Sequence, residues 1–312
     1  MNEKSWSRIF SRTGLALSAF LISSAIAMTA IYTGFTVIGH GYFSADMQLI
    51  VNAICMYLIG FPVAWMIFQT VPHPDPIRKT EKWEVGSWIG LYLICTGVAV
   101  IGNMISTLLA FFIGPAAGAN VVETVILQSN PLLNFILTVI AAPVVEELLT
   151  RKLLIDKILL YGEKTAILVS ALLFGLMHGN FYQFFYAFGI GLILAYAYVR
   201  TGKISGTIAI HMAINFMGSE VILLIGNLEV MPGIAGIMGI GLMALYASIQ
   251  MGAAISGIIL LCCFWRKKRL YQTPYEWSAP HITFSRRIRT VAGNPGMILF
   301  ILLCLLRFVL NV

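Results

Sequence analysis

Four side chains that can accept or release a proton lie inside long apolar stretches of this chain. Glu146 and Glu147 occupy one stretch, His178 a second and His211 a third. Ionisable residues are rare in segments that cross a membrane, because each needs a partner or a watery cavity there. A carboxylate and a histidine together can polarise a water molecule directly, so the set is suited to hydrolysis without a covalent nucleophile. These four residues are therefore the candidate functional groups.

The two carboxylates are predicted to have different roles, because neighbours on a helix point about 100° apart. Glu147 stands four residues before Arg151, the favourable order for an ion pair on one helical face. We assign Glu147 and Arg151 mainly to structure and Glu146 to a cavity.

One turn before the carboxylates, Pro143 cannot donate a backbone hydrogen bond. We expect the carbonyl of Val139 to lose its helical partner and the helix to kink there.

Each histidine has a partner four residues away on the same face of its helix. Phe174 precedes His178 by four residues, and Asn215 follows His211 by four. Taken alone, His211 has an alternative interpretation as a packing histidine bonded to a neighbouring carbonyl. The combination carries more weight, because two carboxylates, two histidines and an asparagine come from only three segments.

Two further ionisable residues of the apolar stretches, Glu220 and Arg307, lie within a turn or two of a predicted membrane edge. Each has two interpretations. The side chain either snorkels to the interface or serves the function.

The elements that position these residues are predicted to be membrane helices. Of 312 residues, 59% are hydrophobic and 11% charged, and the mean hydropathy is +0.88. Soluble domains average about 25% charged residues, so the composition excludes an ordinary cytosolic enzyme, a disordered chain and a nucleic-acid-binding module. The expected fold class is all-α, a polytopic integral membrane bundle of about eight or nine transmembrane helices.

The net charge of +7 follows from where the basic residues lie. Basic clusters occupy every second interval between apolar runs, which is the positive-inside pattern. This predicts a multi-pass protein, in the plasma membrane of a bacterium, with a cytoplasmic N-terminus and no nucleic-acid partner.

Nine apolar runs are read as spans, and they divide into three parts. The spans are 13–38, 47–71, 88–113, 132–150, 165–179, 181–199, 204–226, 234–264 and 294–311. The parts are N-terminal transmembrane helices at 1–131, a catalytic core bundle at 132–226, and C-terminal transmembrane helices with a basic cytoplasmic loop at 227–312.

Small residues at four-residue intervals predict that three core helices pack closely. The three stripes are Ala171, Gly175 and Gly179; Ala187, Gly191 and Ala195; and Ser205, Ala209 and Ala213.

The depth of the candidate residues poses a geometric problem. At about 1.5 Å per residue, Glu146 lies about 8 Å from Arg151, whereas His178 lies about 20 Å beyond Lys164. These residues meet only if the span at 165–179 tilts or begins outside the membrane.

These motifs carry a resemblance to a known family. The ordered set Glu146-Glu147-x-x-x-Arg151, Phe174-x-x-x-His178 and His211-x-x-x-Asn215 resembles the CAAX protease and bacteriocin-processing family, also called the Abi family. The resemblance covers about 132–226, and the flanking spans carry no motif that matches. It implies an intramembrane endopeptidase of the glutamic type, and an asparagine at the third motif is what the proteolytic members carry.

The resemblance also implies roles for the site residues. Glu146 and His178 would activate water, while His211 and Asn215 would donate to the oxyanion. Residue types and faces alone leave open which histidine has which role. No cofactor is expected, although a zinc site formed by His178, His211 and Glu146 stays open as an alternative. The compact HExxH signature of zinc peptidases is absent from the sequence.

The expected substrate is a peptide or protein at the lipid bilayer. The family includes members that trim prenylated CaaX tails and others linked to bacteriocin maturation or self-immunity. A proton-coupled transporter or channel is an alternative, against which no inverted repeat is visible. A non-catalytic membrane immunity or scaffold protein is another. The sequence does not define the substrate or the oligomeric state.

Overall fold

The computed structural model describes residues 3–39, 43–72, 80–114, 120–265 and 283–310. Every regular element in these residues is a helix, so the all-α prediction is confirmed. The first half of the chain forms α1 (Glu3–Val37), α2 (Ala45–Ala53), η1 (Ile54–Gly60), α3 (Phe61–Gln69), α4 (Val85–Ile113), α5 (Val121–Gln128), α6 (Pro131–Asn134), η3 (Phe135–Ala141), α7 (Ala142–Glu147), η4 (Leu148–Ile155), α8 (Asp156–Ile158) and η5 (Leu159–Tyr161). The second half forms α9 (Glu163–Met177), α10 (Phe181–Thr201), α11 (Ile204–Asn215), η6 (Phe216–Glu220), α12 (Val221–Glu229), α13 (Ile234–Trp265), α14 (Phe284–Ala292) and α15 (Pro295–Leu310).

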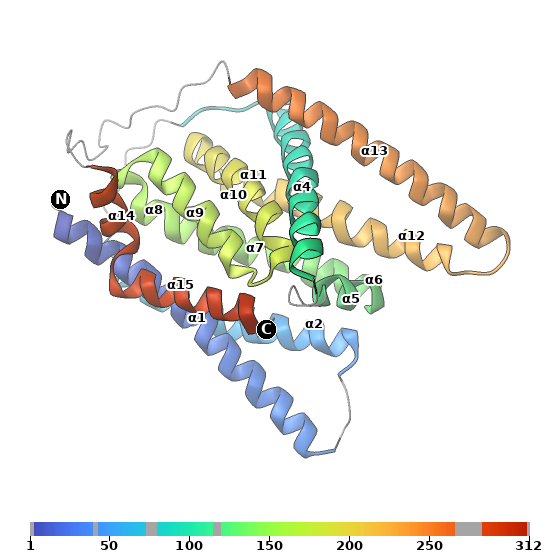
Figure 1. Ribbon diagram of the computed structural model, residues 1–312, viewed down its shortest axis with the longest axis horizontal. Helices are drawn as coiled ribbons and strands as arrows, with labels where there is room; N and C mark the ends of the chain where they lie inside the picture. Colours follow the sequence, from blue (N-terminus) through green and yellow to red (C-terminus); the bar gives the residue numbers. More distant parts are fainter. Residues whose placement is uncertain (1–2, 40–42, 73–79, 115–119, 266–282, 311–312) are drawn as a thin grey trace.

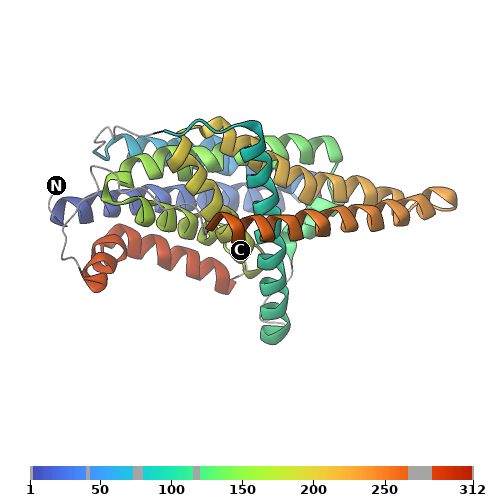
Figure 2. The same ribbon diagram turned by 90° about the horizontal axis from the view of Figure 1, so that it is seen from above.

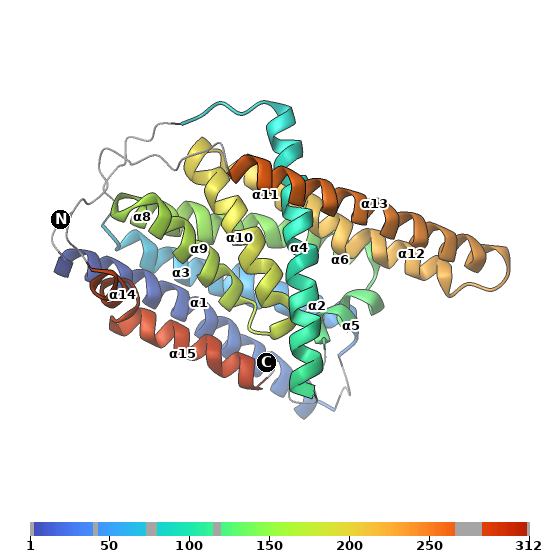
Figure 3. The same cartoon turned by 45° about the horizontal axis from the view of Figure 1, so that its top comes forward.

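The helices surround a central group formed by α9, α10 and α11 (Figure 1). Helix α4 crosses the middle of the molecule and packs against α10 on one side and α13 on the other. Helices α1 and α15 run side by side along one edge, and Figure 2 shows α15 on one face of the bundle. The hairpin of α12 and α13 extends away from the body at the opposite end (Figure 3).

Seven helical stretches in the described residues are long and apolar enough to cross a membrane. An eighth is added if α14 and α15, which are bent by 77° at their junction, count as one span. This agrees with a polytopic membrane bundle. The remaining expected span, 165–179, corresponds to α9, which has only 15 residues. At about 1.5 Å per residue that helix is too short to cross the bilayer alone.

One expected span is longer than the sequence indicated. The segment predicted at 132–150 continues without interruption over Pro131–Tyr161. A basic interval follows position 150 in the sequence, and its first two charges are paired on the helix itself. Arg151 pairs with Glu147, and Lys152 pairs with Asp156 at 2.9 Å. Each pair is four residues apart, so the charges support the helix rather than end it.

Two of the three small-residue stripes pack as predicted. A side chain at Gly191 would meet the backbone of Ala171, and one at Gly175 would meet Phe184, so α9 and α10 approach backbone to backbone. The third stripe was wrong. Ser205 and Ala209 are exposed, and the buried face of α11 instead carries Thr207, Ile210 and His211.

Candidate active site

The continuation of the helix to Tyr161 explains how Glu146 and His178 can lie at the same depth. The helix Pro131–Tyr161 and α9 form an antiparallel hairpin whose turn lies at Gly162. Glu146 precedes this turn by as many residues as His178 follows it, so the two lie at similar depth without any tilt. Arg151 does not mark the end of the helix, which continues for ten more residues to Tyr161.

The imidazole of His211 lies between the two adjacent carboxylates. Its Nδ1 is 3.2 Å from Oε1 of Glu147, and its Nε2 is 3.7 Å from Oε2 of Glu146. Neighbouring helical side chains diverge, so each carboxylate reaches a different edge of the ring. When Nδ1–H donates to Glu147, Nε2 of a neutral ring is an acceptor that faces the Glu146 carboxylate. Two facing acceptors repel each other, so Nε2 of His211 and the Glu146 carboxylate need a shared proton or a water molecule between them.

Glu147 and Arg151 form the predicted ion pair, fully buried, with 3.1 Å between Oε2 and Nε. Arg151 Nη1 also donates to Ser170 Oγ on α9 at 2.7 Å, and that hydroxyl donates to the carbonyl of Thr150. The pair thus ties the two helices of the hairpin together. Because Glu147 also contacts His211, its role extends beyond the structural one predicted.

Phe174 stands at the centre of the group. Its ring meets the His178 ring edge-on at 4.9 Å and the His211 ring at 5.7 Å between centroids. The Arg151 guanidinium lies 5.1 Å from the same centroid, within the range of a cation–π contact. A single buried ring therefore spaces the two histidines and the arginine.

The hydrogen bond of His178 sets its tautomer. Nδ1 lies 2.9 Å from the carbonyl oxygen of Phe174, one turn earlier on α9. A carbonyl can only accept, so Nδ1 carries the proton and Nε2 of the neutral ring is left as an acceptor. His178 is half-buried, and Glu146 and His211 are close enough to act on it electrostatically.

Asn215 has a partner that the sequence did not reveal. Its Nδ2 donates to the carbonyl of Thr138 at 3.0 Å. The segment η3 is a π-helix, and the N–H of Ala142 donates to Leu137, five residues back. In that register the donor missing at Pro143 leaves the carbonyl of Thr138 free. The expected orphan at Val139 is therefore wrong by one residue.

Comparisons with known proteins point to the same region of the chain. A family model described as "Type II CAAX prenyl endopeptidase Rce1-like" matches residues 128–217, which contain all the site residues above. The chain is 26% identical over 172 residues to the protein named "Putative membrane peptidase YdiL" from Bacillus subtilis (strain 168). That match covers 52% of this chain and 68% of the relative. No solved structure matches the chain.

These matches support the resemblance to the CAAX protease and bacteriocin-processing family. They also support a membrane protease of the CAAX type in general. The family match ends at residue 217, so the C-terminal helices α13 to α15 lie outside it.

Three tertiary neighbours of the site were not found from the sequence. Tyr57 on η1 and Tyr186 on α10 both lie within range of the charge of Glu146. The Tyr186 ring lies 6.5 Å from the His178 ring, and its hydroxyl accepts from Gln183 Nε2 at 2.9 Å. Gln183 and Tyr186 belong to the aromatic start of α10 directly after His178, a signal that sequence reasoning could have used.

The two residues with open interpretations both point into the protein. Glu220 is buried and accepts from Asn134 Nδ2 at 2.9 Å. Arg307 Nη1 donates to the carbonyl of Met177 at 2.6 Å. Neither side chain snorkels, because each has a polar partner inside the bundle.

The described residues hold no group of three His, Cys, Asp or Glu side chains that could bind a metal ion. His211 Nδ1 faces Glu147, and His178 Nδ1 faces a carbonyl. The absence of a cofactor stays a prediction.

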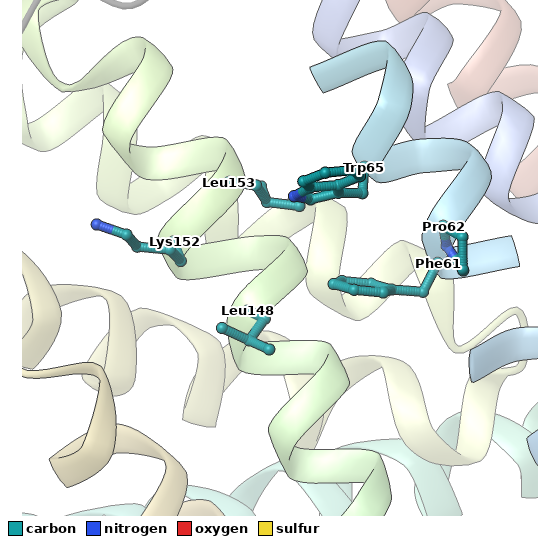
Figure 4. Close-up of a pocket in the computed structure, with 6 residues that line it drawn as sticks. All are labelled: Phe61, Pro62, Trp65, Leu148, Lys152 and Leu153. Carbon is teal, nitrogen blue, oxygen red and sulfur yellow. The ribbon is translucent and has the colours of Figure 1, made fainter. Parts of the chain in front are cut away.

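An apolar pocket of about 340 Å³ lies beside the helix that carries Glu146. Figure 4 shows side chains of α3 facing those of η4 across it. The lining residues are Phe61, Pro62, Trp65, Leu148, Lys152 and Leu153. Lys152 supplies the charged group, and its amine also pairs with Asp156. Leu148 of the pocket wall directly follows Glu147 in the chain.

Proposed function

We propose that this protein is an intramembrane endopeptidase that hydrolyses a peptide bond with a water molecule activated by Glu146. The observation that carries the proposal is the arrangement of three side chains. Glu146 faces His211 at 3.7 Å, and both histidine rings pack on Phe174. A half-buried carboxylate and two imidazoles from three helices form a set that can hold and move protons inside a membrane bundle.

In the proposed reaction, water attacks the scissile carbonyl carbon. Glu146 takes one proton of the water as the new C–O bond forms, and His178 Nε2 accepts a hydrogen bond from its other proton. The tautomer set by Phe174 supports this role for His178. Glu146 then returns its proton to the leaving nitrogen as the C–N bond breaks. The reaction therefore consumes only water and the peptide, and Glu146 ends in its starting protonation state.

The oxyanion needs at least one donor. We assign His211 and Asn215 to it, with His211 acting in its protonated form, because its Nδ1–H is already used by Glu147. One Nδ2 hydrogen of Asn215 is used by Thr138, which leaves the second for this purpose. The Tyr186 hydroxyl is a further candidate, because it accepts from Gln183 and retains its own proton for donation.

The proposed substrate is a membrane-associated peptide, either prenylated or carrying a leader segment. The pocket beside Leu148 supports an apolar substrate group, since its walls are apolar except for Lys152. We further propose that the site opens to the cytoplasm of a bacterium and that the N-terminus lies on the same side. The distribution of basic residues supports this orientation.

Peptide cleavage by the purified protein tests the proposal. Prenylated and unprenylated peptides would be followed by mass spectrometry in detergent and in proteoliposomes. Glu146→Gln and His211→Ala should each lower kcat by about 10²-fold or more. Glu123→Gln, an exposed acid on α5, is the matched control and should keep wild-type activity. Wild-type rates in Glu146→Gln would contradict the assigned site.

Two outcomes would favour another class of protein. Ion flux through liposomes that is lost in Glu146→Gln, without peptide cleavage, would indicate a transporter or channel. Neither cleavage nor flux would favour an immunity or scaffold protein. Comparison of membrane peptides from cells with wild-type protein and with Glu146→Gln would identify a natural substrate.

A further inference from the structure

Helix α9, which presents His178, ends beside the other site residues. Its last carbonyl groups accept hydrogen bonds. His178 N donates to Gly175 at 3.3 Å, and Gly179 N donates to Leu176 at 3.1 Å. The imidazole of His178 covers the carbonyl of Phe174. A helix that ends away from bulk water needs such partners, because its final carbonyls lack intrahelical donors.

The carbonyl of Met177 accepts a hydrogen bond from a residue near the other end of the chain. Arg307 Nη1 on α15 donates to it at 2.6 Å. The carbonyl of His178 itself accepts from Asn180 Nδ2 at 3.0 Å. A cation at this position also interacts favourably with the negative end of the helix dipole. Arg307 and Asn180 thus complete the end of α9.

The turn after His178 is built around the same arginine. Gly179 has φ +69°, and a Cβ added there would lie 2.8 Å from Cζ of Arg307. Glycine is needed both for the left-handed backbone and for the close approach of the guanidinium. The adjacent Phe308 ring packs edge-on against Phe181 at 5.1 Å, on the first residue of α10. Helix α15 therefore packs directly against the turn at Gly179.

We infer that Arg307 is a positioning residue of the active site, which fixes the end of α9 through the Met177 carbonyl and so holds His178 beside Glu146. Arg307 lies outside residues 128–217, which match the family model, so this part of the site comes from the chain's own C-terminal helix. The inference deepens the proposed function and rests on it for its effect on catalysis. The contact itself does not depend on that function.

Kinetics of three variants test the catalytic part. Arg307→Met should lower kcat at least about tenfold with little change in KM, because a small displacement of a catalytic group is costly. Arg307→Lys should recover a measurable part of kcat, since it keeps a cationic donor. Leu306→Ala, an exposed neighbour on α15, is the control. Wild-type kcat in Arg307→Met would overturn the inference, and so would a Lys variant no better than Met when both variants fold.

Crosslinking tests the contact without reference to activity. In a background with the five native cysteines replaced, a short bis-maleimide reagent should crosslink Phe181→Cys to Phe308→Cys, whose rings are in contact in the wild type. Arg307→Met should lower the yield of this crosslink several-fold. A second pair, Trp6→Cys with Tyr161→Cys, replaces rings 5.2 Å apart elsewhere in the bundle and should be unaffected.

The two assays separate the possible failures. An unchanged Phe181–Phe308 crosslink in Arg307→Met would show that Arg307 does not hold the turn. A wild-type protein that cleaves no peptide would contradict the proposed function instead, and the crosslink would still decide the role of Arg307.

Discussion

His211 Nδ1 lies 3.2 Å from Oε1 of Glu147, the carboxylate whose other oxygen binds Arg151. A fully buried ion pair therefore also orients the imidazole that faces Glu146. The orientation matters, because a histidine whose Nδ1–H is held by a carboxylate presents its Nε2 in a defined direction. Glu147 thus connects the stability of the helical hairpin to the geometry of the site.

Loss of Glu147 should affect both stability and activity. Glu147→Leu leaves the charge of Arg151 buried without a partner, which costs about 3–5 kcal/mol. The melting temperature in detergent and kcat should therefore both fall. Glu147→Leu combined with Arg151→Leu should recover much of the melting temperature but little activity, because His211 still lacks its acceptor. A fully active double variant would contradict the orienting role.

The bond from Asn215 to Thr138 should depend on Pro143. Asn215→Leu leaves the partly buried carbonyl of Thr138 without a donor, which costs up to about 1–3 kcal/mol. Pro143→Ala supplies a backbone N–H that can reach Thr138 in the π register. We expect the double variant to lose less free energy of unfolding than the sum of the single variants. Additive losses would show that Asn215 does not compensate for the proline.

The same variants separate the two roles of Asn215. If its second Nδ2 hydrogen serves the oxyanion, the double variant with Pro143→Ala should regain stability but not kcat. Recovery of both would limit Asn215 to its bond with Thr138.

Removal of the Tyr186 hydroxyl should slow the chemical step. Tyr186→Phe keeps the ring beside His178, so packing should be preserved while a hydrogen-bond donor is lost. Loss of an oxyanion donor costs up to about 10²–10³-fold in kcat, and we expect at least a tenfold decrease with little change in KM. Tyr32→Phe, on the distant α1, controls for the loss of a hydroxyl. Equal kcat in Tyr186→Phe and wild type would exclude Tyr186 as a donor.

Activity should not depend on a metal ion. We expect full peptide cleavage after dialysis against a strong chelator, and no stoichiometric zinc by elemental analysis of the active protein. Loss of activity that zinc alone restores would favour the site formed by His178, His211 and Glu146.

Filling the apolar pocket should weaken substrate binding more than it slows chemistry. Leu148→Trp would occupy the space beside Trp65 and should raise KM several-fold while kcat stays within about twofold, as expected for loss of uniform binding. Leu168→Trp places the same ring at an exposed position on α9 and is the control. An unchanged KM in Leu148→Trp would show that the pocket does not take the substrate.

Much of the site could be predicted from the sequence because local spacing determines which side chains share a helical face. The pairing of Glu147 with Arg151 is such a case, since residues four apart meet on any regular helix. The membrane class followed in the same way, because apolar length and charge content are properties of the chain alone.

The convergence of these residues was decided by the tertiary structure. Spacing cannot show that a helix continues through Arg151, and this continuation is what brings Glu146 level with His178. Nor can it show that a π-helical segment moves the orphan carbonyl from Val139 to Thr138, because that register depends on packing against α11.

Arg307 shows the same division most clearly. The sequence determined that a charged residue stands in an apolar helix and therefore needs a partner. Only the folded chain decided that the partner is the carbonyl of Met177, 130 residues away. A backbone carbonyl has no sequence signature, because every residue carries one, so its need for a donor becomes visible only when the helix end has a place in the fold.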